Sequence, residues 1–388
     1  MIGMEWKAME TMNRSRSKGT GKGAARKTGA RSKDSSGQAA SATRPAPRLP
    51  AGGKPPRHQA TKPSSHQAMS EEVDVFPSMP RRLDGLMPSL PFGHFSDPDT
   101  RVFVGDCREV LPRLPEVREG LVDLIFADPP FNWNRAYDQW HDDLSEEKYL
   151  EFTYAWLDLC VRALRPAGSM WVNIPDDWAA EIVVHLKKRG LTMVNWCVWH
   201  YRFGQNTNNR FINSKVHALY FAGDAKRRTW NAEPILEPSD RATTYFDPRT
   251  HAKKEGVQGM RVPMDVWYGK HFGRVQGNNK ERRPSHDNQI PEVYLERVIR
   301  ACSNEGDLVL DPFLGSGTTC LVARELKRRS IGVEFSKANA KSAFERIKEG
   351  PLRIKHDQPT RHVTAIFEPR RRRQGIEASS HQGQDARH

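Results

Sequence analysis

The residues best suited to chemistry are Asp128, Pro129, Pro130 and Phe131, which directly follow the apolar run 121–127. Such a run predicts a strand buried on both faces, and α/β proteins bind ligands at the carboxyl ends of these strands. Two consecutive prolines keep the chain extended, so the Pro129 carbonyl joins the Asp128 carboxylate as a second acceptor. With Phe131 as an aromatic plane, these acceptors suit the exocyclic amino group of a stacked heterocycle. The alternative is a proline turn capped by an aspartate.

A second motif, residues 311–319 (DPFLGSGTT), lies between a short apolar strand and a predicted helix. Gly315 and Gly317 allow a tight turn and close approach of a ligand, and the helix N-terminus offers free N–H groups. The next strand ends at Glu334, where an acid in a nucleotide fold accepts ribose hydroxyls.

The glycine motif lacks the features of a phosphate site. Cys320 stands where a dinucleotide fingerprint has its last glycine, and no lysine follows the loop as in a P-loop. These residues favour S-adenosylmethionine, a nucleoside that carries no phosphate. A plain helix cap and an NAD site are the alternatives.

Alternating strands and helices must position both motifs, and they predict a parallel α/β sheet. The first half is expected to have strands at 101–105, 121–127, 169–174 and 192–199, with helices from Asp106 toward 114, from Ser145 toward 164, and at 177–188. Residues 165–168 are expected to form a turn. The second half is expected to have helices at 291–302, 318–326 and 338–348, with strands at 308–310 and 330–334. The run 216–221 (VHALYF) is a further candidate strand.

The composition divides the 388 residues into tails and a folded body. Residues 1–95 are rich in Ser, Gly, Ala, Pro, Lys and Arg without a hydrophobic period, so we expect disorder there. A solvated tail, a transit peptide and a misplaced start are all open for this segment. Residues 96–200 and 289–350 are expected to form the two halves of one domain, with an irregular insertion at 201–288. Residues 351–388 are expected to be a weakly ordered basic tail.

The net charge of +14 is concentrated in two places. Residues 14–62 carry 13 basic side chains and one acid, whereas residues 65–369 carry 42 of each sign. Within that neutral body, residues 200–290 carry 16 basic and 9 acidic groups. A basic segment in a neutral domain indicates a polyanion partner, and a solvated basic loop is the alternative.

Several classes of protein are disfavoured. No run of 18 apolar residues is present, and the N-terminus has no apolar signal region, so we expect neither a membrane span nor a secretory signal. The five scattered cysteines include no CxxC pair, which fits reduced thiols and a cytoplasmic location. We expect no metal site, since no ligand cluster is evident.

Taken together, the motifs resemble those of the β class of amino-DNA methyltransferases, which modify adenine N6 or cytosine N4. The resemblance covers residues 101–348 and rests on the motif order, the segment 104–108 (VGDCR) and the segment 286–292 (HDNQIPE). It implies a Rossmann-like α/β methyltransferase sheet in circularly permuted order, with an inserted target-recognition region. Phe131 stands where Tyr is more usual in the family, and Ile290 where many members have Lys.

The resemblance also implies a role for each motif residue. Asp128, Pro129, Pro130 and Phe131 would hold a flipped base. Asp311, Phe313, Gly315, Gly317 and Thr318 would surround the methionine part of S-adenosylmethionine, and Glu334 would hold its ribose. Asp106 and Cys107 would lie at its adenine ring; for Cys107, a small helix-start residue without ligand contact is the alternative.

Residues 201–288 would then read the DNA. The side chains expected to contact it are Arg202, Gln205, Asn206, Arg210, Lys215, Arg282 and Arg283, with further candidates at Asn208, Asn209, Arg227, Arg228, Arg249, Lys253, Lys254, Arg274 and Lys280. The aspartate at position 128 favours adenine as the target. Cytosine N4 methylation, a noncatalytic DNA-binding relative and a nucleotide-dependent oxidoreductase are the alternatives. The expected partner is double-stranded DNA; a homodimer and a restriction endonuclease partner are left open.

Overall fold

The computed structural model describes residues 92–360, apart from 136–139, 141, 202–203, 205, 251–256, 270, 284–285 and 287. The predicted tails through residue 91 and from residue 361 onward lie outside the described residues. Arg202, Gln205, Lys253 and Lys254, which were predicted to contact DNA, also lie outside them.

The described chain folds around one large sheet. Its strands are β1 (His94–Ser96), β2 (Thr100–Val104), β3 (Val122–Ala127), β4 (Leu164–Ile174), β5 (Thr192–His200), β6 (Lys215–Ala222), β9 (Val266–Trp267), β10 (Leu308–Asp311) and β11 (Arg329–Glu334). A separate two-stranded ribbon pairs β7 (Glu237–Pro238) with β8 (Met260–Arg261).

Helices connect and cover these strands. They are α2 (Cys107–Val110), α3 (Pro115–Arg118), α4 (Glu146–Ala163), α5 (Asp176–Lys188), α6 (Asp240–Thr243), α7 (Glu292–Cys302), α8 (Thr318–Glu325) and α9 (Lys337–Glu349). Short 3-10 turns occur at Leu111–Arg113, Glu233–Ile235 and Pro248–Thr250.

The strand order in the sheet is β1-β2-β11-β10-β3-β4-β6-β5-β9. Strands β2, β11, β10, β3 and β4 are parallel, whereas β1 and β6 run antiparallel to their neighbours. This is the predicted α/β fold, with a mostly parallel sheet. The crossover from β10 leads toward β11, and the crossover from β3 leads the other way toward β4. The boundary between β10 and β3 is therefore a topological switch point, where open α/β sheets bind ligands.

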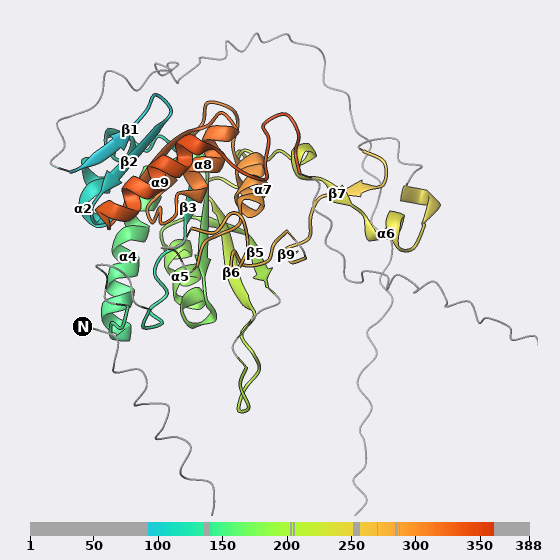
Figure 1. Ribbon diagram of the computed structural model, residues 1–388, viewed down its shortest axis with the longest axis horizontal. Helices are drawn as coiled ribbons and strands as arrows, with labels where there is room; N and C mark the ends of the chain where they lie inside the picture. The colour runs from blue at the N-terminus through green and yellow to red at the C-terminus, as the bar shows by residue number, and fades with distance from the viewer. Residues whose placement is uncertain are drawn as a thin grey trace, which may run out of the picture. The chain divides into compact units, whose positions relative to one another are not determined.

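Right-handed crossovers in opposite directions place their helices on opposite faces of the sheet. Helix α8 follows β10 and packs with α7 and α9, which lie together in the orange-red part of Figure 1. Helix α4 follows β3 and packs with α2, α3 and α5. Each face of the parallel strands is covered, as their continuous apolar sequence requires.

Local sequence explains where the main helices begin and which face they bury. Ser145 caps α4 by accepting a hydrogen bond from the Lys148 amide. Tyr149, Phe152 and Trp156 then recur at helical spacing and are buried. The predicted helix start at Ser145 is confirmed.

The candidate strand at 216–221 is confirmed: it belongs to β6, which enters the main sheet between β4 and β5.

Three expectations differ from the structure. Residues 165–168 continue β4 instead of forming a turn. Strand β1 lies partly inside the predicted tail because it pairs with β2 and covers that edge.

The third difference concerns residues 351–360, which were expected to be weakly ordered. The amides of Leu352 and Arg353 both donate to Oε2 of Glu292 at the start of α7. Ile354 is buried, and Arg300 donates to the carbonyls of Lys355 and His356. These bonds fasten the segment to α7.

Candidate active site

Four acidic side chains stand in a row at the carboxyl ends of neighbouring strands. Asp106 follows β2, Glu334 ends β11, Asp311 ends β10, and Asp128 follows β3. Because these four strands are adjacent and parallel, their order in the sheet sets the order of the acids. The two sequence motifs, 183 residues apart between Asp128 and Asp311, are thus brought side by side.

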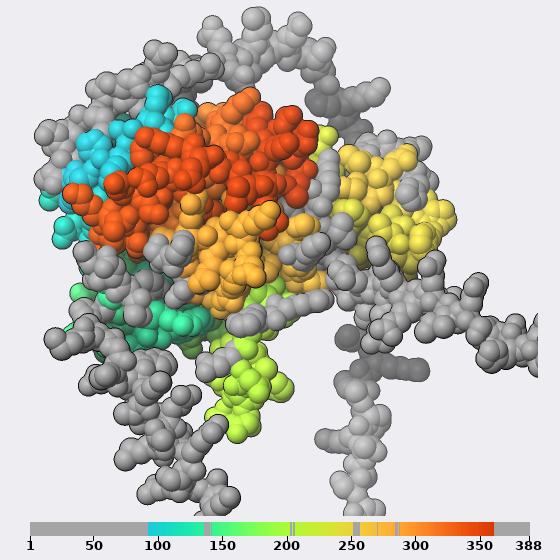
Figure 2. Space-filling view, in the orientation of Figure 1, coloured from blue at the N-terminus to red at the C-terminus, as the bar shows by residue number. Residues whose placement is uncertain are grey.

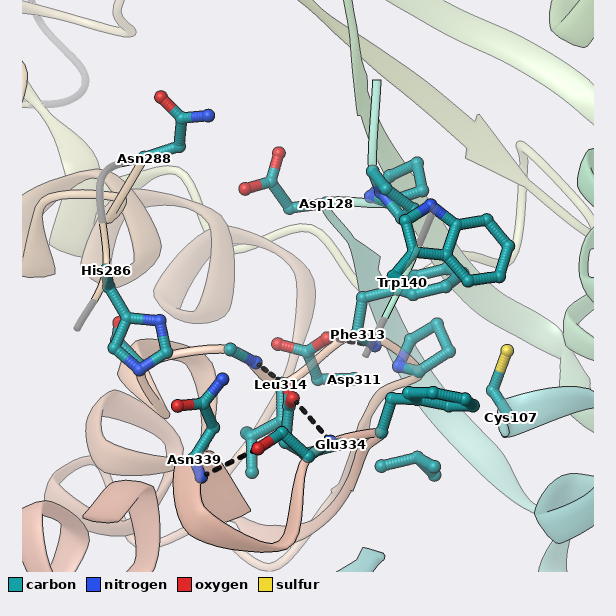
Figure 3. A pocket seen from close by; sticks show the side chains of 18 of the residues that line it. Cys107, Asp128, Trp140, His286, Asn288, Asp311, Phe313, Leu314, Glu334 and Asn339 are labelled. Atoms are coloured by element: carbon teal, nitrogen blue, oxygen red, sulfur yellow. Dashed lines mark hydrogen bonds between the residues drawn. The ribbon is translucent and has the colours of Figure 1, made fainter. Parts of the chain in front are cut away.

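All four acids line a single cavity of about 780 Å³, a size typical of small-molecule sites. Figure 3 shows the carboxyl groups of Asp128 and Asp311 pointing into it, with His286 and Asn288 on one side and Trp140 and Cys107 on the other. Aromatic rings form one wall: Phe313 lies 6.1 Å from Phe152, and Trp140 lies 4.6 Å from Phe152 between ring centroids.

The glycine loop lies between β10 and α8. Gly315 has φ of +50° and lines the cavity, and a Cβ there would make an ordinary contact with the Phe313 carbonyl oxygen at 3.9 Å. Gly317 was expected to surround the methionine part of the cofactor, but it does not line the cavity. Its φ is +82°, and a Cβ there would lie 3.0 Å from Ala343 of α9, so glycine is required by backbone conformation and packing.

Arg346 of α9 supports this loop from behind. Its buried guanidinium donates to the carbonyl and hydroxyl of Ser316 and to Oγ1 of Thr318 at 2.9–3.1 Å. The Thr318 hydroxyl is thus engaged by α9, although the residue still lines the cavity. Arg346 also forms a buried ion pair with Glu292. This support has no local signal in the sequence, because 28 residues separate Arg346 from Thr318.

Glu334 joins the glycine loop to its own strand end. Its Oε2 accepts a hydrogen bond from the Gly315 amide over 2.9 Å, and its Oε1 accepts one from the Ser336 amide over 3.0 Å. Each carboxylate oxygen can accept a second hydrogen bond, so the predicted contact with ribose hydroxyls is compatible with both.

Asp106 and Cys107 line the cavity after β2, which β11 and β10 separate from β3 and Asp128. Asp106 caps α2, accepting from the Arg108 amide, and forms an ion pair with the Arg108 side chain at 2.6 Å. Cys107 is buried, and burial raises the pKa of its thiol far above the ordinary value. This thiol is therefore neutral and suited to contact rather than to nucleophilic chemistry.

Asp311 is a buried carboxyl group and Asp128 a partly buried one, and both line the cavity. Burial raises the pKa of Asp311 to about 7, opposed by hydrogen bonds from Thr319 and from the Phe313 amide. Burial likewise raises the pKa of Asp128 to about 7, opposed by the Asn173 hydrogen bond and by Arg274. The charge of Asp311 raises the pKa of Asp128 further, so a cationic ligand between them would favour both ionised forms.

A buried hydrogen-bonded chain stands behind Asp128. Asn173, the penultimate residue of β4, donates through Nδ2 to Oδ1 of Asp128 over 3.2 Å. The hydroxyl of Tyr294 on α7 donates to Oδ1 of Asn173 over 2.9 Å. Sequence analysis missed both residues. A polar residue near the end of an otherwise apolar strand was the available signal for Asn173.

The chain after Asp128 is held by two aromatic side chains. Tyr149 donates through its hydroxyl to the Pro130 carbonyl over 2.6 Å, and Trp178 donates through Nε1 to the Phe131 carbonyl over 3.0 Å. No described residue donates to the Pro129 carbonyl, as predicted from the tandem prolines. Phe131 lines the cavity and packs edge-on against Trp133 with centroids 5.2 Å apart.

Asp142 anchors the loop that continues from Phe131. Its carboxylate accepts hydrogen bonds from the amides of Asn132, Trp133 and Arg135 at 2.8–3.1 Å. Asn132, at φ of +59°, exchanges two hydrogen bonds of 2.8 Å with Leu144. This brings Trp140 over the cavity, a residue for which the sequence held no periodic signal.

A second, open groove of about 1620 Å³ shares Arg135 and Asn288 with the cavity and so continues from it. Three of the predicted DNA contacts, Asn206, Arg210 and Arg282, line this groove. Trp133, Trp178, Asn209 and Arg274 line it as well.

Two other predicted DNA contacts are placed differently. Lys215 forms an ion pair with Asp176, and Arg283 forms one with Glu349, so each cation already has an acidic partner. Neither lines the groove. Sequence alone does not show which basic side chains are engaged within the protein.

The charge of the cavity discriminates between cofactor classes. Among the described residues that line it, four are carboxylates, and Arg135 is the sole Lys or Arg. Phosphate groups require cations or clustered N–H donors, whereas a sulfonium with an ammonium group is attracted by carboxylates. The cavity therefore fits S-adenosylmethionine better than a dinucleotide.

Comparison with known proteins agrees with this site. A family model described as DNA methylase matches residues 122–345, which is more than half of the chain. The chain belongs to the DNA methylase family. The matched segment includes the DPPF motif at 128–131, the groove-lining residues and the glycine loop, so the resemblance predicted from the motifs is confirmed.

Individual relatives are also similar to this methylase. The type II methyltransferase M.HpaI of Haemophilus parainfluenzae is 34% identical over 244 residues, covering 62% of this chain and 73% of that protein. The DNA adenine methyltransferase YhdJ of Escherichia coli is 31% identical over 242 residues, covering 62% and 80%. The crystal structure of the M1.HpyAVI–SAM complex is 21% identical with a TM-score of 0.44, covering 64% and 98%.

These findings confirm the predicted enzyme class, a DNA methyltransferase that uses S-adenosylmethionine. DNA is accordingly its partner. In the part of the chain that the structure describes, no helix is long and apolar enough to span a membrane, and no three His, Cys, Asp or Glu side chains form a metal-binding group. The five cysteines are free and buried.

Proposed function

We propose that this methylase transfers a methyl group to the exocyclic N6 of adenine in double-stranded DNA. The observation that carries the proposal is the end of the cavity at β3, where Asp128, Pro129 and Phe131 all line the wall. Two acceptors next to an aromatic plane suit an amino group on a stacked purine. The name of YhdJ, a DNA adenine methyltransferase, supports the same base.

The strand order suggests how the cofactor would lie. S-adenosylmethionine supplies an electrophilic methyl group on a positively charged sulfur. Asp106 and Cys107 would contact its adenine ring, Glu334 its ribose, and Asp311 with Phe313, Gly315 and Thr318 its methionine part. This order along β2, β11 and β10 directs the methyl group toward Asp128 at β3.

Asp128 would act on the amino group of the base. As that nitrogen is methylated it gains positive charge, which an ionised carboxylate stabilises most in the transition state. Asp128 is also placed to accept the proton that the nitrogen loses. Pro129 would accept the second amino hydrogen, while Tyr149 and Trp178 hold the segment at this geometry. Alignment and electrostatics would therefore account for the catalysis.

The base must leave the duplex stack to reach Asp128, at a cost of a few kcal/mol. We propose that the groove lined by Asn206, Arg210 and Arg282 holds the duplex during this step. In the same proposal, residues 96–200 are the catalytic half, 201–288 the target-recognition region with β6 shared by the sheet, and 289–350 the cofactor half.

Mass spectrometry of nucleosides tests the base. The purified full-length protein is incubated with unmethylated duplex DNA and S-adenosylmethionine, and the DNA is digested to nucleosides. We expect N6-methyl-2′-deoxyadenosine, formed at a rate lower by about 10²-fold or more when an Asp128→Asn variant is used. N4-methylcytosine without N6-methyladenine would contradict the adenine assignment while retaining the amino-methylase class.

A further inference from the structure

The connection between β5 and β6 forms a hairpin that projects from the body of the protein. His200 of β5 pairs with Lys215 of β6, and the Tyr201 amide donates to the Ser214 carbonyl over 2.9 Å. Figures 1 and 2 show the hairpin as the yellow-green projection beyond the sheet. The projection is therefore built directly on two strands of the main sheet.

Close packing defines the arms of this hairpin. A Cβ on Gly204 would lie 2.3 Å from Cγ2 of Ile212 and 2.5 Å from the carbonyl oxygen of Asn213, so the two arms touch at a glycine. At the tip, the Thr207 hydroxyl donates to Oδ1 of Asn209 over 2.7 Å. These contacts give the described part of the hairpin a defined turn.

Phe211 is the unusual residue of this hairpin. Its side chain is 96% exposed, more than any other large hydrophobic side chain among the described residues. It directly follows the tip, next to Ile212 at 46% exposure. A fully hydrated aromatic ring on a projecting, packed hairpin is unfavourable for the isolated protein, which indicates a partner.

The surroundings of Phe211 identify the chemistry of that partner. Asn206, Thr207, Asn209 and Arg210, all within five residues of Phe211, line the open groove that continues from the active-site cavity. Amide and guanidinium groups of this kind bind phosphates and base edges. An apolar ring among such groups is the arrangement by which proteins insert a wedge between stacked bases.

We propose that Phe211 inserts into the base stack of duplex DNA and thereby promotes extrusion of the target base. The inference rests on the proposed function, because it supplies a device for the base flipping which that function requires. Stacking of the phenyl ring on exposed base faces would offset part of the cost of unstacking the target. Phe211 would thus be a positioning residue, remote from the transferred methyl group.

The test compares two DNA duplexes that contain the site methylated by the wild-type enzyme, mapped beforehand by sequencing. In one duplex the target base is normally paired, and in the other it faces a noncomplementary base. Single-turnover methylation is measured for the wild type, Phe211→Ala and Phe211→Trp. Leu352→Ala is the matched control, since it removes an apolar side chain that is 64% exposed and far in sequence from the groove.

We expect Phe211→Ala to slow methylation of the paired duplex at least about 10-fold, the scale of one lost base-stacking contact. On the mismatched duplex, whose target is already unstacked, the loss should stay below about 3-fold. Phe211→Trp should retain methylation of both, and Leu352→Ala should match the wild type. S-adenosylmethionine binding should be unchanged in every variant.

Equal losses on both duplexes, or no loss on either, would overturn the wedge while leaving the proposed methylation intact. If the preceding sequencing finds no site that the wild-type protein methylates, the proposed function and the wedge are overturned together. Sedimentation of the DNA-free proteins tests a second copy of this chain as the occupant. A wild-type dimer that Phe211→Ala converts to a monomer would contradict the DNA assignment.

Discussion

Asn173 donates a hydrogen bond through Nδ2 to Oδ1 of Asp128 over 3.2 Å; Asn173 is buried, and Asp128 is partly buried at the wall of the cavity. Oδ1 of the Asn173 side chain accepts a hydrogen bond from the Tyr294 hydroxyl. The orientation of the amide is thereby fixed, with its donor toward the carboxyl group. This relationship ties the ionisation of the proposed catalytic aspartate to two residues outside its motif.

Replacement of Asn173 by Leu should move the acid limb of the pH–rate profile to higher pH. The Asn173 hydrogen bond lowers a pKa that burial has raised to about 7, so its loss raises that pKa further. The shift should be about one to two units, since a hydrogen bond to a charged group contributes roughly 1.5–3 kcal/mol. Single-turnover methylation from pH 5.5 to 9 measures it.

Two variants control this experiment. Tyr294→Phe should shift the limb in the same direction but less, because it removes only the bond that orients Asn173. Ser169→Ala lies on the same strand, where the hydroxyl contacts Tyr220 instead, and should leave the limb in place. A uniform loss of rate without a shift would mean that Asn173 is structural only.

The raised pKa of Asp128 also makes a prediction about stability. Burial raises the pKa of Asp128 in the folded protein from the ordinary value of 3.8 to about 7. The carboxyl group therefore keeps its proton to a higher pH in the folded protein than in the unfolded chain. The penalty for ionising Asp128 is therefore absent below about pH 3.8, grows as pH rises between these values, and is complete above about 7.

Asp128→Asn should accordingly melt at a higher temperature than the wild type, with a larger difference at pH 8 than at pH 5. The difference at pH 8 is on the order of 1–4 kcal/mol, or several degrees in Tm. Calorimetry without cofactor measures it, with the exposed Asp143→Asn as the control. A difference that is the same at both pH values would contradict the buried, protonated state.

Glu334→Ala should weaken S-adenosylmethionine binding by roughly 1.5–3 kcal/mol, the range for hydrogen bonds to a charged group. The variant also loses the two bonds that join the glycine loop to β11. Isothermal calorimetry measures the affinity, and Glu345→Ala on α9, an exposed acid beside Lys341, is the control. Unchanged affinity in Glu334→Ala would refute the ribose assignment.

Arg346→Met should both destabilise the fold and weaken cofactor binding. Removal of the guanidinium leaves Glu292 buried without its partner, at a cost of about 3–5 kcal/mol. It also frees the loop at Ser316 and Thr318, which line the cavity. Urea unfolding with and without S-adenosylmethionine measures both effects. Normal stability in the variant would show that the Glu292 pair contributes little.

The sequence predicted those parts of the site that are local in the chain. The DPPF motif after β3 and the glycine loop after β10 each follow an apolar run, so their place at a strand end could be inferred from a few neighbouring residues. The adjacency of β3 and β10 was not visible in the residues themselves; it followed only from the family resemblance. Long-range pairings carry no local signal in a single sequence.

The parts that were missed depend on such pairings. Asn173 contacts Asp128 across 45 residues, and Arg346 contacts Thr318 across 28 residues, so only the fold brings these partners close. Asp142 contacts the Asn132 amide across 10 residues of an irregular loop, which has no periodic pattern to predict the contact. Ion pairs likewise engage Lys215 and Arg283, which a count of basic residues cannot separate from unpaired ones. Strand β6 was recognisable as a strand, but its position between β4 and β5 was not.

The central claim is that Asp128 stabilises the charge that develops on the amino nitrogen. Single-turnover methylation by Asp128→Asn, paired with calorimetry of S-adenosylmethionine binding, tests it most directly. The account predicts a methyl-transfer rate lower by about 10²-fold or more, with cofactor affinity little changed. A near-normal transfer rate in this variant would contradict the account and reduce Asp128 to the cap of a proline turn.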